Sequence, residues 1–337
     1  MLFFMNDYSE GAHPQVLEAL TRTNMEQTVG YGMDPHCANA ADLIRKRIGR
    51  EDADVHFFVG GTHTNYTAIT AFLRPHEAVI SPCRGHICVH ETGAVEARGH
   101  KIIHVPTEDG KLEPQYIDEE IRRHEDEHWV KPKMLYISDT TEFGTVYTKA
   151  ELETLRAKCN EYGLYLYLDG ARLATALTCE ENDLTIEDIA RLTDAFSIGA
   201  TKNGALFGEA LVILKPELKE EFRWIQKQTG AILAKGRLLG VQFEALFTDD
   251  LYFKMAQHSN DMAKLLREGI AAKGYRFMAD SPTNQIFPIF PNELVDRLEK
   301  EVAFERYDPI GDSEYGIRFV TSWATPQEDV EKLLELI

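Results

Sequence analysis

The 337-residue sequence lacks several features that would identify particular classes of protein. It has no tandem repeat and no low-complexity tract. No apolar run could span a bilayer, and the apolar start at residues 1–5 is too short for a secretory signal. The five cysteines are irregularly spaced, which argues against a disulfide framework. Together these absences predict a cytoplasmic protein with reduced thiols.

Positive charge is also scarce. Lysine and arginine number 36 against 55 aspartates and glutamates, so the formal net charge is -19. This excess of negative charge argues against non-specific binding to nucleic acid or to anionic membranes. It leaves room for a local basic pocket that binds an anionic cofactor.

Short apolar segments alternate regularly with helical patterns along the first two thirds of the chain. The expected strands cover residues 54–61, 77–82, 101–106, 133–139, 164–169, 195–200 and 210–214. Expected helices cover residues 38–50, 62–73, 86–97, 114–128, 149–163 and 185–193. Such an alternation predicts βαβ units and an α/β fold with a mostly parallel sheet.

The pattern divides the chain into three parts. Residues 1–25 form an extended arm and a helix that starts near Pro14. Residues 26–235 form the large α/β domain. Residues 236–337 carry long helices, a few short strands and a closing helix, which predicts a smaller α+β domain.

Chemically reactive residue types stand at three expected strand ends. Gly60-Gly61-Thr62-His63 opens a helix, Asp169 ends the segment "LYLYLD", and Lys202 follows "SIGAT". Taken singly, the glycines are common in such turns, Asp169 could cap the next turn, and Lys202 could reach out to water. In open parallel sheets, however, ligands bind at the carboxyl ends of the strands.

Together these residues match the requirements of pyridoxal phosphate. That cofactor needs a lysine amine for its aldehyde, a carboxylate for its pyridine nitrogen and a cup for its phosphate. Lys202 would be the amine, Asp169 the carboxylate, and Gly61-Thr62-His63 the cup. Asp169 precedes Lys202 by 33 residues, which leaves room for one helix and one strand between them.

The sequence resembles the low-specificity L-threonine aldolases of the β-eliminating lyase family, which are fold-type I pyridoxal phosphate enzymes. The matching segments are "YGMDP", "GGTHTN", "GHICVHETGA", "LDGAR", "TKNG" and "IRFVTSW", and they follow the family's order over nearly the whole chain. The resemblance implies a three-layer, aspartate aminotransferase-like large domain with a mostly parallel sheet.

The resemblance also implies a role for each matching residue. Lys202 would hold the cofactor covalently, Asp169 would pair with the ring nitrogen, and His86 would stack on the ring and assist proton transfer. The remaining cofactor contacts would come from Gly61, Thr62, His63, Thr201 and Arg172. The substrate would be bound by Arg172, Arg318 and Asn6, and by Tyr31 of a neighbouring subunit.

Three departures from the family pattern bear on the substrate. Asn6 replaces a carboxylate-binding serine, and Glu142 replaces a histidine credited with handling the substrate hydroxyl. The segment "QTGAILAKGRLLG" lacks the phosphate-facing arginine, for which Lys227, Lys235 or Arg237 could substitute. Glu142 could equally be an ordinary turn residue before Gly144.

Two possible metal sites carry little weight. His86 and His90 could share a helix face with two nearby cysteines, but no second pair of ligands accompanies them. "HEDEH" at 124–128 matches the zinc-protease pattern H-E-x-x-H, yet its surroundings are charged on nearly every face and Pro132 follows. We therefore expect no metal.

The expected function is cleavage of a β-hydroxy-α-amino acid, such as L-threonine or L-allo-threonine, to glycine and an aldehyde. The alternatives are a pyridoxal phosphate-dependent β-elimination or transamination of another amino acid, and a non-catalytic binding protein with the same fold. The resemblance further implies a homotetramer, or a dimer, with sites at the subunit interface.

Overall fold

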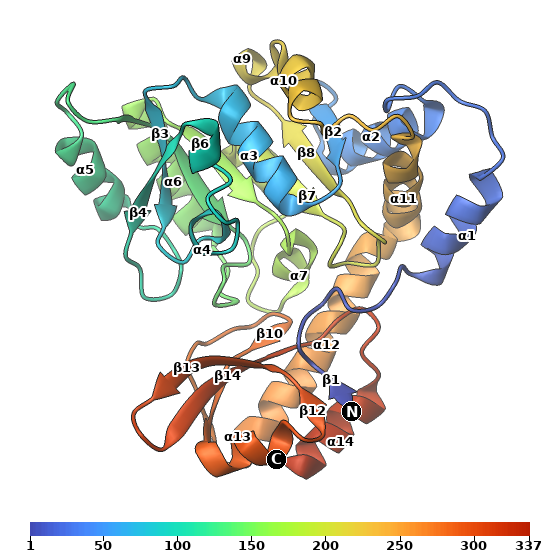
Figure 1. Ribbon diagram of the computed structural model, residues 1–337, viewed down its shortest axis with the longest axis vertical. Helices are drawn as coiled ribbons and strands as arrows, with labels where there is room; N and C mark the ends of the chain where they lie inside the picture. The colour runs from blue at the N-terminus through green and yellow to red at the C-terminus, as the bar shows by residue number, and fades with distance from the viewer.

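The central sheet organises the larger part of the molecule. The computed structural model describes residues 1–337, and its sheet order is β2–β8–β7–β6–β5–β3–β4 (Figure 1). The strands are β2 (Asp54–Phe58), β3 (Glu77–Pro82), β4 (Lys101–Val105), β5 (Lys131–Ser138), β6 (Tyr165–Asp169), β7 (Ala195–Gly199) and β8 (Glu209–Ile213). Only β8 runs antiparallel to its neighbours, so the expectation of a mostly parallel sheet is confirmed.

Helices surround this sheet. They are α1 (Pro14–Thr23), α2 (Pro35–Ile48), α3 (Gly61–Phe72), α4 (His86–Val89), η1 (Glu96–Arg98), α5 (Pro114–Arg123), α6 (Lys149–Tyr162), α7 (Leu173–Thr178), α8 (Ile186–Leu192), α9 (Pro216–Lys219), α10 (Phe222–Gln228) and α11 (Arg237–Phe247). The expected start of α1 at Pro14 is confirmed, and the side chain of His13 caps its N-terminus.

Both faces of the sheet are covered, as strand β6 shows. Leu166 and Leu168 belong to a cluster of 44 buried residues that includes residues of α2, α6 and α8. Tyr167, between them, belongs to a different cluster of 18 that includes residues of α3 and α10. Because alternate strand residues point to opposite faces, the three-layer architecture explains why these strands read as continuous apolar runs.

The C-terminal part lies below the central sheet in Figure 1. It has its own core of 16 buried residues. Its elements are η2 (Thr248–Asp250), α12 (Leu251–Ala272), β9 (Arg276–Phe277), β10 (Gln285–Ile286), β11 (Pro288–Pro291), α13 (Asn292–Leu298), β12 (Val302–Ala303), β13 (Glu305–Ile310), β14 (Glu314–Val320) and α14 (Gln327–Leu336). The first strand of the chain, β1 (Leu2–Phe3), pairs with β12 in parallel. The domain boundaries at residues 25 and 235 stay a prediction.

Several expected elements differ in the structure. The helix expected at 86–97 is only the single turn α4 followed by the 3-10 turn η1, because the backbone between them leaves the helical region at Thr92 and Gly93, where φ is positive. The helix expected at 114–128 ends at Arg123, so the "HEDEH" segment is not helical. Strand β13 was missed because its sequence, "ERYDPI", contains charges and a proline.

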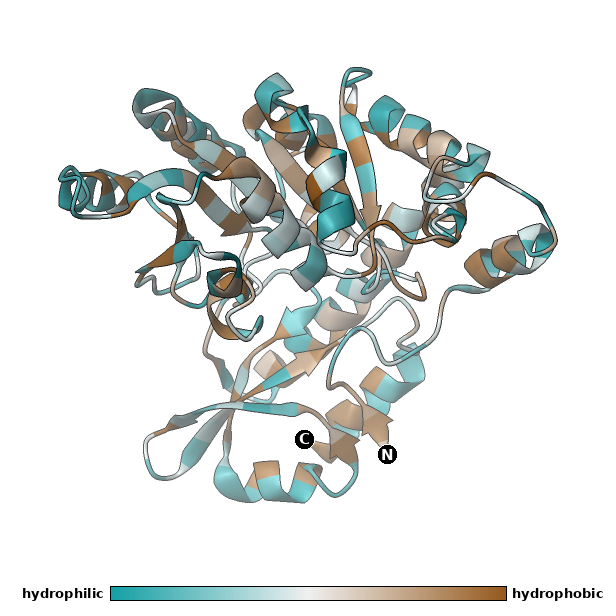
Figure 2. Cartoon of the chain, turned by 45° about the horizontal axis from the view of Figure 1, so that its top comes forward, coloured by the Kyte–Doolittle hydropathy of each residue, from teal (hydrophilic) through white to brown (hydrophobic).

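Hydropathy follows burial over much of the chain. Figure 2 shows apolar colour concentrated on the central strands and on the inner faces of the helices, with polar colour on the outer helices. Among all the helices, none combines the length and apolar character that a bilayer-crossing segment needs.

Candidate active site

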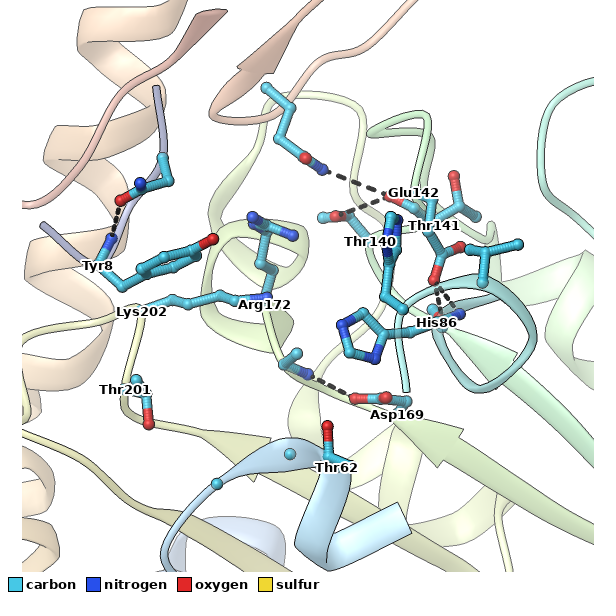
Figure 3. Close-up of a pocket in the computed structure, with 18 of the residues that line it drawn as sticks. Tyr8, Thr62, His86, Thr140, Thr141, Glu142, Asp169, Arg172, Thr201 and Lys202 are labelled. Atoms are coloured by element: carbon cyan, nitrogen blue, oxygen red, sulfur yellow. Dashed lines mark hydrogen bonds between the residues drawn. The ribbon is translucent and has the colours of Figure 1, made fainter. Parts of the chain in front are cut away.

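A cavity of about 920 Å³ lies at the carboxyl edge of the parallel strands, where the large part of the molecule faces the C-terminal part. The residues expected at the site that line it are Asn6, Gly61, Thr62, His86, Glu142, Asp169, Arg172, Thr201, Lys202 and Arg318. In Figure 3, Thr62 and Thr201 lie at one end of the cavity and Glu142 lies at the other, with His86 and Asp169 between them. The topology therefore brings together residues that are hundreds of positions apart in sequence.

Two of the expected residues do not line this cavity. The side chain of His63 turns away and its Nε2 lies 3.1 Å from the carbonyl oxygen of Thr229. Tyr31 is 51% exposed and lines a smaller, separate cavity of about 300 Å³. Its predicted role involves a neighbouring subunit, which a single chain does not test.

Asp169 is held in place by four donors at the end of β6. Its Oδ2 accepts hydrogen bonds from Asn65 Nδ2 at 2.8 Å and from the Tyr136 hydroxyl at 2.6 Å. Its Oδ1 accepts from the Ala171 amide at 3.0 Å and from the Ser197 hydroxyl at 3.4 Å. A carboxylate that is only 4% exposed and has this many donors is fixed in one orientation.

A buried hydrogen-bond chain links Asp169 to His86. Asn65 Nδ2 donates to Asp169 and also to Glu91 Oε1 at 2.8 Å. The same Glu91 oxygen lies 2.8 Å from His86 Nδ1, and the Glu91 side chain is fully buried. The anionic partner on Nδ1 favours a proton there, which orients the ring and leaves Nε2 for other contacts.

Lys202 lies in the turn between β7 and β8, where it is half-buried and lines the cavity. Burial lowers the pKa of this amine, and the Arg172 guanidinium lowers it further, although Asp7, Asp169 and Glu209 oppose the shift. A lysine that gives up its proton more readily is a better nucleophile at neutral pH. The desolvation that made Lys202 unusual in the sequence is therefore also what prepares it for chemistry.

Arg172 is already paired with a carboxylate of the N-terminal arm. Its Nε and Nη2 donate to the two oxygens of Asp7 at 2.7 and 3.0 Å. Asp7 is 1% exposed and also accepts from Asn284 Nδ2 at 2.9 Å. Burial alone would raise the pKa of Asp7, but Arg172 and Lys202 outweigh it and hold that pKa below its usual value.

Arg318 enters the cavity from strand β14. Its Nη1 donates to Gln285 Oε1 at 3.2 Å, and Nη2 is ion-paired with Glu305. Burial and the nearby Arg172 both lower its pKa from the usual value. Two guanidinium groups that face one cavity make it attractive to a carboxylate.

Glu142 lies beside His86 at the far end of the cavity. Its Oε1 accepts from the backbone amide of His86 at 2.8 Å and from the Ser138 hydroxyl at 3.2 Å. Burial raises the pKa of this carboxyl group, and Asp169 contributes to the same effect. Glu142 therefore holds a proton more readily than an ordinary glutamate, which suits a group that exchanges protons.

The opposite end of the cavity is suited to an anion. The backbone of Gly60 and Gly61 and the N-terminus of the 12-residue helix α3 face it, together with the hydroxyl of Thr62. None of the three cations suggested for this role lines the cavity. Lys235 is exposed, Lys227 lies over the ring of Tyr31, and Arg237 donates to the backbone oxygens of residues 24 and 26.

Four residues at or next to the site were not anticipated from the sequence. They are Asp7, Asn65, Glu91 and Glu209. The sequence gives one hint for each of them: it is a polar residue beside or inside an apolar or glycine-containing segment. None reveals its partner, since the Asp7–Arg172 and Asn65–Asp169 pairs are 165 and 104 residues apart.

The structural comparison defines the class of the protein. Thermus thermophilus aspartate aminotransferase superposes with a TM-score of 0.74 at 19% identity, covering 100% of this chain and 90% of the other, which shows the fold. The chain therefore has the aspartate aminotransferase-like architecture of fold-type I enzymes.

The sequence comparisons are more specific. The family model for beta-eliminating lyases matches residues 5–291. The low specificity L-threonine aldolase of Pseudomonas aeruginosa is 32% identical over 99% of this chain and 95% of its own length. A solved threonine aldolase of Leishmania major is 50% identical with a TM-score of 0.99, covering 100% of this chain and 98% of that one. The chain belongs to the beta-eliminating lyase family, and it is a lyase.

Proposed function

We propose that the chain binds pyridoxal phosphate in the 920 Å³ cavity and cleaves L-threonine, or a related β-hydroxy-α-amino acid, to glycine and an aldehyde. The observation that carries the proposal is the shared cavity of Lys202, Asp169 and Arg318. It places an amine of lowered pKa, a fixed carboxylate and a cation together. The names of the Pseudomonas and Leishmania relatives support the choice of substrate.

The residues of the cavity fit this cofactor. Lys202 would hold its aldehyde carbon and Asp169 its pyridine nitrogen, while His86 would lie on its ring. Thr62 and the amides at the start of α3 would hold its phosphate. When bound, the cofactor supplies the electron sink that makes cleavage at Cα possible.

The chain's own residues would then perform distinct tasks. The unengaged Nη1 of Arg172 and the guanidinium of Arg318 would bind the substrate carboxylate and so fix the orientation of the bonds at Cα. Glu142 or His86 would accept the proton of the substrate hydroxyl as the carbon–carbon bond breaks. Glu91 would keep His86 in place through Nδ1.

A second reaction on the same residues is β-elimination or transamination of another amino acid. Glu142 favours keeping this candidate, because a carboxyl group of raised pKa handles protons differently from the histidine of the family pattern. Replacing Glu142 and comparing threonine cleavage with serine deamination separates the two reactions.

We further propose that the active form is a homotetramer or dimer in the cytoplasm. Several large apolar side chains are exposed around the connection between α1 and α2 and on α10, namely Met25, Val29, Tyr31, Met33 and Trp224. Exposed apolar side chains in such numbers favour burial against another copy. Sedimentation of the purified protein measures the assembly directly.

The test of the proposal is the visible spectrum of the protein with added pyridoxal phosphate, beside the Lys202→Ala variant. A yellow absorbance band in the native protein that is absent in the variant supports cofactor binding through Lys202. Release of glycine and acetaldehyde from L-threonine supports the reaction. The absence of any band with excess cofactor would refute the proposal, and a band without glycine release would leave the second reaction or a binding protein.

A further inference from the structure

The anion-binding end of the cavity contains a carboxyl group whose charge opposes the proposed ligand. Glu209 is the first residue of β8, lines the cavity and is only 5% exposed. The strand register places it beside Phe58 at the end of β2 and beside Gly199 at the end of β7. It therefore lies between the Gly60–Thr62 segment and the Thr201–Lys202 turn.

The hydrogen bonds of Glu209 leave one oxygen available. Its Oε1 accepts from the Thr201 hydroxyl at 2.9 Å. No side chain or amide of the protein donates a hydrogen bond to its Oε2. This oxygen is not fully enclosed by protein atoms, so it reaches the cavity. Because the single hydroxyl proton of Thr201 is given to Glu209, Thr201 does not offer it to a ligand in this arrangement.

Few charges surround Glu209. The titratable groups that act on it or respond to it are Lys202 in the turn, Asp169 and Tyr167 on β6, and Tyr252 on α12. On β2 its strand partner is the apolar Phe58, and from the start of α3 the uncharged Gly61 and Thr62 line the same cavity. On α11 the side chains nearest to the neighbouring Gly208 are the apolar Leu239 and Phe243. Burial, helped by Asp169, raises the pKa of Glu209 to about 8, against the opposing effects of Thr201, Lys202 and the backbone amide of Ala200.

We propose that Glu209 is a neutral carboxylic acid in the cofactor-bound enzyme and that its Oε2–H donates a hydrogen bond to the cofactor phosphate. This inference rests on the proposed function. An ionised carboxylate next to a phosphate dianion would be repelled, whereas the acid offers the donor that Thr201 withholds. Where Glu209 is ionised in the free protein, binding transfers one proton from solvent to it; where Glu209 is already neutral, binding exchanges no proton, and in neither case does another bond change.

The proposal has a thermodynamic consequence that activity alone would not reveal. If the phosphate binds only the protonated form, affinity falls by about tenfold for each pH unit above the pKa of Glu209 in the free protein. In the same range, binding takes up about one proton per site. The phosphate itself is already a dianion there, because its second pKa is about 6.

The experiment measures proton uptake by titration calorimetry at about pH 8.5 in two buffers of different ionisation heat. The ligand is pyridoxine 5′-phosphate, which has no aldehyde and cannot react with Lys202. Unphosphorylated pyridoxine is the control ligand, because it shares every ring ionisation. Lys202 is the other group that could take up a proton, so the native protein, Lys202→Ala, Glu209→Gln and the double variant are compared.

We expect an uptake of about one proton in the native protein and almost none in the two proteins that carry Glu209→Gln. Lys202→Ala should still show uptake, but a smaller one, because the Lys202 cation lowers the pKa of Glu209 and its removal leaves more of the free protein with a neutral acid. Because the glutamine amide donates at any pH, Glu209→Gln should bind at least as tightly as the native protein at pH 9. Glu209→Ala, with its fold checked by circular dichroism and by pyridoxine binding, should bind about tenfold more weakly at pH 7.

Equal proton uptake with and without Glu209, or weaker binding of Glu209→Gln at pH 9, would overturn the inference. If the native protein shows the yellow band with pyridoxal phosphate but takes up no proton on binding pyridoxine 5′-phosphate, this inference alone is overturned. The absence of both the band and pyridoxine 5′-phosphate binding overturns the proposed function as well.

Discussion

The ion pair between Asp7 and Arg172 provides a direct test of how the N-terminal arm is attached. Replacing Asp7 by asparagine preserves its shape but removes the charge that faces both donors at 2.7 and 3.0 Å. Asp7 is 1% exposed and the Arg172 side chain 13%, so the arginine would be left buried without its partner. Breaking such a pair costs about 3–5 kcal/mol.

The chain offers a control with the same geometry in water. Arg50 and Asp52 also form a two-bond pair, at 2.8 and 2.8 Å, but their side chains are 36% and 58% exposed. An exposed pair contributes about 0–1 kcal/mol because water and salt screen it. Asp52→Asn should therefore change the free energy of unfolding far less than Asp7→Asn, although the two substitutions are chemically identical.

The assay is urea unfolding of the cofactor-free protein at pH 7 for the two variants, for Arg172→Met and for Asp7→Asn/Arg172→Met. We expect the double variant to be less destabilised than the sum of its single changes, because the pair is lost as a unit. Because the pKa of Asp7 is lowered on folding, its stabilisation is present above about 3.8 and is lost as pH falls through the lower, folded-state value. Equal effects of Asp7→Asn and Asp52→Asn, or strictly additive single changes, would refute the reasoning.

Two other substitutions test the chemistry and the packing of the site. If Glu142 is the base, its raised pKa moves the acid limb of the pH–rate profile for glycine release toward neutral pH. Glu142→Gln should then remove that limb. An unchanged limb in this variant would point to His86 as the base. Gly170→Ala would place a Cβ 2.0 Å from the carbonyl oxygen of Ser197, next to Asp169, and should cost about 1–3 kcal/mol in urea unfolding. Gly11→Ala, with nothing within 4 Å, should leave unfolding unchanged, and equal results for the two alanines would contradict the packing argument.

The sequence was most informative where apolar runs end abruptly. The six-residue run that ends at Asp169 and the run before Lys202 indicated strand ends, and parallel topology then placed both residues at one edge. Local pattern was sufficient there because the strands are covered on both faces and few polar residues interrupt them. The sheet and the Lys202–Asp169 part of the site followed from this.

Pairing between distant segments could not be predicted in the same way. No residue near Arg172 in the sequence indicates that its guanidinium is ion-paired with Asp7. The two residues come together only because the N-terminal arm lies along the cavity in the folded protein. Glu91 lies in a segment that was expected to be helical and is mostly turn, and this change of backbone directs it toward Asn65 and His86. Glu209 stands just before the strand predicted at 210–214, although in the structure it is the first residue of β8 and the one acidic residue in it.

The pairing of β1 with β12 has a consequence for the order in which the protein is made. Residues 2 and 3 are synthesised 300 residues before their partners at 302 and 303, and Arg318 follows later still. Until then the arm that carries Asp7 has no strand to join, and Asn284, which also bonds Asp7, is synthesised late. The central sheet can therefore form on the nascent chain, whereas the cavity closes only after the segment that ends with Arg318 has been synthesised.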